Sequence, residues 1–264
     1  MDQGNTAFVL LNSALVLLMT PGLAFFYGGM VRGKSVLNMM MMSFGAMGLI
    51  APIWFLYGYS GAFGTDIGGI IGNPLEFFGS NNLDDATSFV SAVGLPVLVF
   101  IGFQATFAII TVALISGSVA DRMKFSSWLV FVGVWVTLVY IPMAHMVWGG
   151  GLLGADGITS SIATPIDFAG GTVVHINAGV AGLVLAILLG RRRGFGKEPM
   201  RPHNLPFVML GAALLWFGWF GFNAGSALEA NNFAVLAFIN TFLATACAVL
   251  SWTFVEWMFK GKPS

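Results

Sequence analysis

Long apolar segments separated by short polar stretches run along the whole chain. Seven of them have about the length needed to cross a hydrocarbon core, near residues 7–31, 36–60, 90–116, 126–148, 170–190, 205–227 and 233–259. A helix that crosses a bilayer needs about 20 predominantly apolar residues. The pattern therefore predicts an all-α fold, a polytopic membrane helix bundle with seven spans in a single transmembrane domain, residues 1–264.

Charged residues are concentrated in the connections between these segments. All 11 Lys and Arg residues follow the first, third, fifth and seventh segments, so the alternation of spans places them on one side of the membrane. Cytoplasmic loops carry an excess of Lys and Arg, and we therefore predict an N-terminus outside and a C-terminus in the cytoplasm. The opposite side holds the acids Asp2, Asp66, Glu76, Asp84, Asp85, Asp156 and Glu229.

Composition narrows the class of protein further. The chain is 57% hydrophobic and only 8% charged, with a mean hydropathy of +0.87, which excludes a soluble domain and makes the lipid bilayer its surroundings. A formal net charge of zero gives no sign of a nucleic-acid partner. Cys247 is the only cysteine, so no disulfide forms within the chain.

One histidine lies inside an apolar span, in the segment from Asp167 to Arg193. At about 1.5 Å per residue, the helix from His175 to Arg191 covers roughly 24 Å of a core about 30 Å thick. An ionisable group at that depth marks a conduction or proton-handling site. We expect His175 to face protein rather than lipid, because the residues three, four and seven positions away are small: Gly171, Ala178, Gly179 and Gly182.

Aromatic side chains and one hydroxyl share a depth near the predicted outer ends of the spans. Phe103 and Phe107 are four residues apart and lie on one helix face, as do Phe222 and Ser226, while Trp148 ends the fourth span. Taken singly, each is also explained by ordinary packing or an interfacial aromatic belt. Together they predict an aromatic cup that attracts a small cation, with a hydroxyl oxygen able to accept a hydrogen bond from ammonium.

Below this cup the same pattern predicts a narrow apolar passage. Stacked phenyl rings obstruct a hydrated ion, and an apolar lining penalises bare charge. His175 then supplies a polar, protonatable contact. Such a path suits recruitment as ammonium and passage as ammonia, with the proton handled separately.

Several familiar motifs occur in settings that do not support their usual function. Residues 28–35, GGMVRGKS, match a phosphate-binding loop but follow an apolar helix instead of a strand, so we interpret them as a basic turn. The thioethers of Met39 to Met42 point in different directions around a helix, and we expect no metal site. No lysine lies inside a span, which excludes a retinal protein.

The sequence gives little support to two further classes of protein, receptors and hydrolases. Asp121-Arg122 follows the third span, as in rhodopsin-like receptors, and a receptor stays a minor alternative. We find no hydrolase motif such as Gly-x-Ser-x-Gly or His-Glu-x-x-His. We therefore expect no catalytic residue, no enzyme activity and no cofactor.

Five ordered segments resemble the Amt-type ammonium transporters of the Amt/MEP/Rh family. They are IGFQATFAIITVALI (101–115), YIPMAHMVWGGG (140–151), DFAGGTVVHINAG (167–179), GFGKEPMRPHNLP (194–206) and WFGFNAGSA (219–227). The resemblance implies that Phe103, Trp148 and Ser226 recruit ammonium at the outer face. It also implies that Phe107 and Phe222 form a gate of stacked rings.

The resemblance implies roles for two more residues, and the number of spans differs from that of the family. His175 matches the first of two pore histidines, and Asp167 matches an acid at the entrance that a working pore needs, with a structural role. The family has eleven spans in an inverted-repeat fold, whereas this sequence contains seven. The second pore histidine, expected on the tenth span, has no counterpart here, and we expect a C-terminally truncated transporter sequence.

The resemblance also implies partners and a location. It implies ammonium or ammonia as substrate with methylammonium as an analogue, a homotrimer in the cell membrane, and a PII-type signal protein at the cytoplasmic face. We expect no nucleic-acid partner. Two alternatives are an ammonium sensor on the same scaffold and a non-functional fragment of a transporter.

Overall fold

The computed structural model of the protein describes residues 1–83, 90 and 92–263. Within this part of the chain, seven helical segments are long and apolar enough to cross a membrane, and they run over Gln3–Met30, Gly33–Phe63, Val97–Val119, Phe125–Trp148, Gly171–Leu189, Leu205–Gly225 and Asn232–Lys260. The prediction of an all-α membrane bundle with seven spans is confirmed. The acids Asp84 and Asp85 lie outside the described residues.

Most of these spans consist of more than one helical element. In four of them an α-helix is interrupted or extended by a short π-helical turn, which hydropathy alone does not predict. The elements of the spans are α1 (Gln3–Met30), η1 (Gly33–Ser35), α2 (Val36–Ile53), η2 (Trp54–Gly58), α3 (Tyr59–Phe63), α5 (Val97–Ile115), η5 (Ser116–Val119), α6 (Phe125–Trp135), η6 (Val136–Tyr140), α7 (Ile141–Trp148), η7 (Gly171–Ile176), α8 (Asn177–Leu189), α9 (Leu205–Trp219), η8 (Phe220–Ala224) and α10 (Asn232–Lys260).

The third span begins later than the predicted residue 90. Helix α5 starts at Val97, immediately after Pro96, which stands at its N-cap in an extended conformation. Gly94 just before it has a φ of +70°, a value that favours glycine. These two residues turn the chain before the helix can begin, although the segment ahead of them is apolar.

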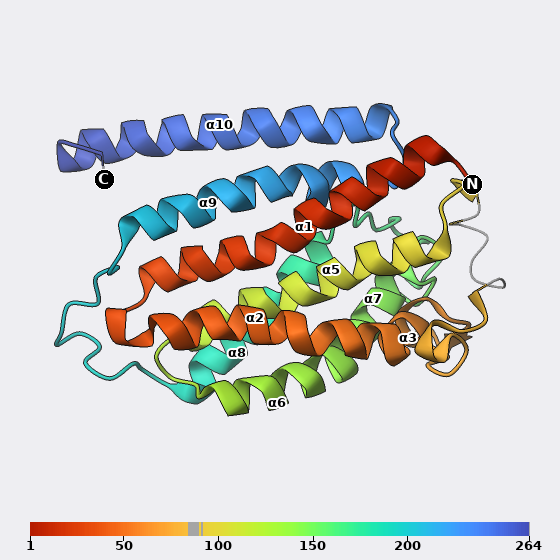
Figure 1. Ribbon diagram of the computed structural model, residues 1–264, viewed down its shortest axis with the longest axis horizontal. Helices are drawn as coiled ribbons and strands as arrows, with labels where there is room; N and C mark the ends of the chain where they lie inside the picture. The colour runs from red at the N-terminus through yellow and green to blue at the C-terminus, as the bar shows by residue number, and fades with distance from the viewer. Residues whose placement is uncertain (84–89, 91, 264) are drawn as a thin grey trace.

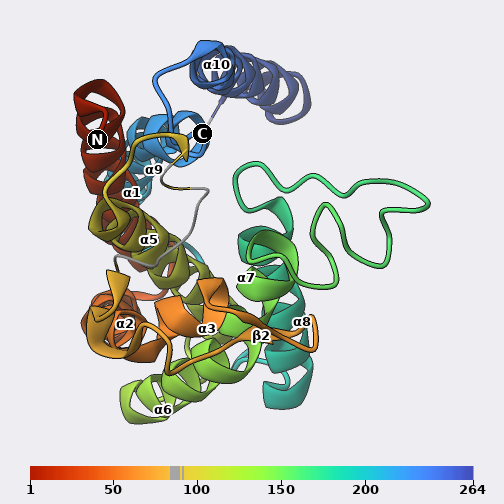
Figure 2. The same ribbon diagram turned by 90° about the vertical axis from the view of Figure 1, so that its right-hand side faces the viewer.

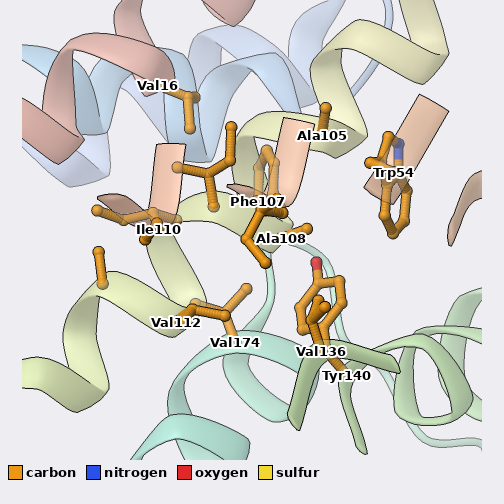
Figure 3. Packing of buried hydrophobic residues seen from close by; sticks show 14 of the residues in the cluster. Val16, Trp54, Ala105, Phe107, Ala108, Ile110, Val112, Val136, Tyr140 and Val174 are labelled. Carbon is orange, nitrogen blue, oxygen red and sulfur yellow. The ribbon is translucent and has the colours of Figure 1, made fainter. Parts of the chain in front are cut away.

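Helix α5 lies at the centre of the bundle. It contacts α1, α2 and α8, and it has the largest buried share of any span. In Figure 1, α10 forms one edge of the bundle beside α9, and α6 lies at the opposite edge. Figure 3 shows side chains of α5 packed among residues from the surrounding spans, including Val16, Trp54, Val136, Tyr140 and Val174.

The first and sixth spans pack closely through glycines. A Cβ added at Gly211 would lie 2.3 Å from the backbone nitrogen of Phe26 and 2.6 Å from the carbonyl oxygen of Gly22. A Cβ at Gly22 would lie 2.9 Å from Cβ of Leu214. Small residues at these positions let the two helix backbones approach each other.

The basic connections meet at one end of the bundle, at the left in Figure 1. Nε of Arg32 donates to Oδ2 of Asp121 at 3.1 Å, and Nδ1 of His203 lies 3.2 Å from the carbonyl oxygen of Val31. The guanidinium of Arg122 donates to the carbonyl oxygen of Gly190. The connections after the first, third and fifth spans therefore share one face, and its cytoplasmic orientation stays a prediction.

The opposite end carries longer connections. A short antiparallel hairpin of β1 (Asp66–Ile67) and β2 (Ile71–Gly72) follows α3, and the 3-10 turn η3 (Phe78–Ser80) comes after it. The connection from α7 to η7 is the long green loop that extends from the helices in Figure 2. Residues of this second connection, among them Ala155, Pro165 and Ile166, line the cavity described next.

Candidate functional site

A cavity of about 620 Å³ lies at the end of the bundle opposite the basic connections. Its walls come from α3, α5, α7, the loop after α7 and the segment after η8. Five of the seven residues proposed from the sequence line it, namely Phe103, Phe107, Trp148, Asp167 and Ser226. The predicted convergence of these side chains from separate spans is therefore present in the structure.

Aromatic rings form a continuous series at the base of this cavity. The ring centroids of Phe103 and Phe107 are 4.9 Å apart, and Phe107 meets Trp148 edge-on at 6.1 Å. Phe107 and Phe222 lie against each other with centroids 4.4 Å apart and an interplanar angle of 32°. Because Phe107 and Phe222 are each only 1% exposed, their rings close the inner side of the cavity.

His175 lies on the far side of Phe222. Their ring centroids are 5.6 Å apart, and the imidazole also stacks on Trp219 at 6.2 Å with an interplanar angle of 13°. The series of rings therefore runs from Trp148 through Phe107 and Phe222 to His175.

His175 faces protein, through its contacts with Trp219 and Phe222, but the row of small residues is only in part a packing face. Within the described chain His175 is exposed, as are Gly171 and Gly179, whereas Ala178 and Gly182 are buried. A Cβ at Gly182 would lie 3.3 Å from Cβ of Ser118 in η5. The helix therefore packs through Ala178 and Gly182, and His175 faces the rings of Trp219 in α9 and Phe222 in η8.

The π-helical turn η7 accounts for one residue of that row, Gly171, which precedes His175. The backbone N–H of His175 donates to the carbonyl oxygen of Gly170, five residues earlier, at 3.0 Å. Gly170 has a φ of +93°, and a Cβ there would lie 2.7 Å from Cγ2 of Val174. A π turn contains more residues than an α turn, so residues before His175 do not follow the three-and-four spacing.

Asp167 caps the start of η7. Its Oδ1 accepts from the N–H of Gly170 at 2.6 Å, and its Oδ2 accepts from the N–H groups of Thr172 and Val173, both at 2.9 Å. Its backbone carbonyl accepts from Nε1 of Trp148 at 3.0 Å. Asp167 thus satisfies N–H groups that a helix start leaves free and links η7 to Trp148.

Ser226 presents oxygen lone pairs at the cavity wall. Its Oγ donates its one proton to the carbonyl oxygen of Phe222 at 2.7 Å. A hydroxyl has one donor and two acceptor lone pairs. With the proton committed to the helix backbone, the side chain acts toward a bound molecule as an acceptor.

Sequence reasoning missed four residues of this region. Phe63 and Phe100 line the cavity, and Trp219 stacks on His175. Gln104 also lines the cavity, and its buried Oε1 has no hydrogen-bond partner among the described residues. The spacing of Trp219 from Phe222 and of Phe100 from Phe103, three residues each, was an available signal.

The histidine of α7 belongs to the scaffold. Nδ1 of the fully buried His145 lies 3.0 Å from the carbonyl oxygen of Ala62, and its Nε2 lies 2.8 Å from Oδ1 of Asp66. Two contacts therefore hold this side chain in place. Among residues 1–83, 90 and 92–263, no group of three His, Cys, Asp or Glu side chains is arranged to hold a metal ion.

Comparison with known proteins identifies the family. The sequence profile described as the Ammonium Transporter Family matches residues 7–264. The chain belongs to the ammonium transporter family. Family membership and the seven apolar helices together make it a multi-pass membrane protein.

Members of the ammonium transporter family resemble this chain in both sequence and structure. An "Ammonium transporter" of Mycobacterium tuberculosis is 57% identical over 276 residues, covering 99% of this chain and 58% of the relative. The crystal structure of Candida albicans Mep2 matches with a TM-score of 0.87 and 34% identity, covering 99% of this chain and 56% of that one. A structure titled "Sensor Amt Protein" matches with a TM-score of 0.86 and 28% identity, covering 99% and 64%. The chain thus spans about three fifths of the length of the curated relatives it matches.

Proposed function

We propose that this protein conducts ammonium across the membrane, taking it up at the aromatic cavity and passing it by the Phe107–Phe222 pair toward His175. The observation that carries the proposal is the unbroken series of aromatic rings from Trp148 to His175. The names of the relatives as ammonium transporters support the substrate. Transport of ammonium requires no catalytic residue, and we expected none from the sequence.

Recruitment combines two interactions at the cavity. The faces of Phe103 and Trp148 attract a cation, by about 0.5–1 kcal/mol when exposed and about 2 kcal/mol or more when desolvated. The Ser226 oxygen accepts a hydrogen bond from ammonium, which potassium cannot donate. Together these contacts favour a small cation that carries N–H groups over a bare metal ion.

Passage inward requires loss of charge. The rings of Phe107 and Phe222, with centroids 4.4 Å apart, exclude a hydrated ion, and an apolar path penalises a bare one. Ammonium therefore transfers one proton to a water molecule in the cavity and moves inward as neutral ammonia, and that proton follows a separate route. His175 offers the next polar contact, and Asp167 holds the entrance in shape rather than carrying protons.

We propose the family's assembly and partner as well. These are a homotrimer in the cell membrane with its N-terminus outside, and a PII-type signal protein at the cytoplasmic face. The gathering of the basic connections on one face supports this orientation. A sensor built on the same scaffold is the competing proposal, motivated by the similarity to the structure titled "Sensor Amt Protein".

The test reconstitutes the intact protein in liposomes and measures methylammonium uptake and ammonium-driven charge movement. We expect uptake that Trp148→Leu weakens for the cation more than for a neutral amine analogue. Trp252→Leu serves as the control because Trp252 is 75% exposed on α10. We also expect His175→Asp to change the charge moved per substrate.

Three results contradict this proposal. Binding of ammonium without flux favours a sensor, and absence of both favours a non-functional fragment. Equal loss for charged and neutral amines in Trp148→Leu rules out the cation–π role.

A further inference from the structure

The start of α1 lies beside two connections that lead to walls of the aromatic cavity. In Figure 1 the N-terminus, the start of α5 and the connection from η8 to α10 lie at the same end of the bundle. The first connection leads into α5, which carries Phe100 and Phe103, and the second carries Ser226 and Leu228. All four of these residues line the cavity. Contacts made by the start of α1 can therefore set the position of both walls.

One side chain, Asn5, joins the two connections. Its Nδ2 donates to the carbonyl oxygen of Val93 at 3.0 Å, and its Oδ1 accepts from the backbone N–H of Ala230 at 3.0 Å. A side-chain amide has both donor N–H groups and an acceptor oxygen, and Asn5 uses both. The backbone N–H of Asp2 adds a second link, since it donates to the carbonyl oxygen of Gly94 at 2.8 Å. Asn5 thus ties α1 to both connections at once.

The connection after η8 contains a strained residue, Leu228. It has a φ of +58°, in the left-handed region that bulky residues rarely adopt, and it is only 6% exposed. Its backbone N–H donates to the carbonyl oxygen of Gly225 at 2.9 Å. Such strain persists only where the surrounding structure holds the backbone in place. The bond from Ala230 to Asn5, two residues further along the chain, is one such restraint.

The residue before Ser226 is also held by α1. A Cβ added at Gly225 would lie 2.7 Å from Cβ of Asn12 and 3.1 Å from Cε2 of Phe103. Gly225 is therefore packed tightly between α1 and α5. Ser226 follows this packed glycine and precedes the bond at Ala230, so a shift of the connection would move its oxygen relative to the ring of Phe103.

We propose that Asn5 is a positioning residue for ammonium recruitment, which keeps the Ser226 oxygen close enough to the ring of Phe103 for one cation to contact both. A ring attracts a cation through its face, and a hydroxyl oxygen accepts one N–H. The two contacts add only when both reach the ion together. The inference rests on the proposed function, and Asn5 acts on the cation only through the connection that carries Ser226.

The test measures methylammonium binding to the intact, detergent-purified protein by calorimetry and methylammonium uptake in liposomes. In Asn5→Ala we expect the dissociation constant and the KM of uptake to rise roughly fivefold, because one hydrogen bond to the cation is lost. The maximal rate per folded protein should change little. Asn38→Ala is the matched control, since Nδ2 of Asn38 also donates to a backbone carbonyl, that of Met123 at 3.2 Å, at the basic end of the bundle. We expect it to keep the KM of the unaltered protein.

Two further variants separate positioning from stability. Asn5→Asp keeps an oxygen for the N–H of Ala230 but cannot donate to Val93. Measured at high ionic strength, which screens the added charge, it should bind methylammonium nearly as well as the unaltered protein. Ser226→Ala removes the acceptor itself, so adding Asn5→Ala to it should raise the dissociation constant no further.

Four results would overturn the inference while the proposed function stands. They are an unchanged KM in Asn5→Ala, a reduced melting temperature and uptake without a change in KM, an Asn5→Asp protein as weak as Asn5→Ala, and a full further loss when Asn5→Ala is added to Ser226→Ala. The second result would make Asn5 a purely structural residue, and the third would assign its effect to Val93. Absence of both binding and uptake in the unaltered protein would refute the proposed function, and this inference with it.

Discussion

Replacing Asp167 with alanine removes the acceptor of three backbone N–H groups at the start of η7. Those groups belong to Gly170, Thr172 and Val173. Loss of an N-cap side chain costs about 0.5–2 kcal/mol, and hydrogen bonds to a charged acceptor contribute about 1.5–3 kcal/mol before solvent screening. Because Asp167 is partly exposed, we expect a cost of about 1–2 kcal/mol.

The assay is thermal unfolding of the intact protein in detergent, paired with methylammonium uptake in liposomes. A cost of this size lowers the melting temperature by about 2–8 °C in a chain of this length. Asp167→Asn keeps one carbonyl oxygen, so we expect about half of that shift. Uptake should fall together with stability, because the carbonyl of Asp167 also holds the indole N–H of Trp148 at 3.0 Å.

The control is Asp156→Ala, which removes an exposed acid from the same connection between α7 and η7. Like Asp167→Ala, it removes one negative charge from this connection, but it leaves the hydrogen bonds at the start of η7 in place. A melting temperature unchanged in Asp167→Ala, together with lost uptake, would refute the structural role. That result would make the charge of Asp167 itself part of ammonium recruitment.

Two further predictions concern the scaffold. His145→Leu leaves the carbonyl of Ala62 without its partner, and we expect a loss of about 1–3 kcal/mol in thermal unfolding. Asp66→Asn should be milder than Asp66→Leu, because an amide N–H can donate to Nε2 of a neutral imidazole, and equal shifts would contradict the hydrogen-bond account. Gly211→Ala forces α1 and α9 apart and should cost about 1–3 kcal/mol, whereas Gly48→Ala meets open space and should change stability by less than about 1 kcal/mol. Similar losses at the two glycines would argue against close helix packing.

The spans and the aromatic cavity could be predicted from the sequence. Span lengths follow from the thickness of a bilayer, so hydropathy located all seven helices. Phe107 and Phe222 could be expected to meet because each belongs to a pair four residues apart near the same predicted depth. The start of α5 was misplaced because apolar composition continues across Gly94 and Pro96, where the backbone turns.

The contacts of His175 could not be predicted from the sequence, for a physical reason. A π turn lengthens one helical turn while leaving the hydropathy of the segment unchanged, so the register shift at Gly170 has no periodic signature. Gln104 was missed because a single amide in an apolar span is more often a packing residue. The roles of all these side chains in transport stay proposals.

The central claim is that ammonium passes between the rings of Phe107 and Phe222, and a direct test compares ammonium and potassium currents in liposomes. Phe222→Ala and the milder Phe222→Leu shorten the side chain that packs against the ring of Phe107. Phe220→Ala is the matched control, since Phe220 stacks on Phe238 of α10 at 4.4 Å, whereas Phe222 stacks on Phe107 at 4.4 Å.

The account predicts that both substitutions at Phe222 reduce the preference for ammonium over potassium, by about tenfold in Phe222→Ala, a change of about 1.4 kcal/mol. Phe220→Ala should keep the wild-type preference. Unchanged selectivity in folded Phe222→Ala and Phe222→Leu proteins would contradict the claim that the ring pair lies on the ammonium path.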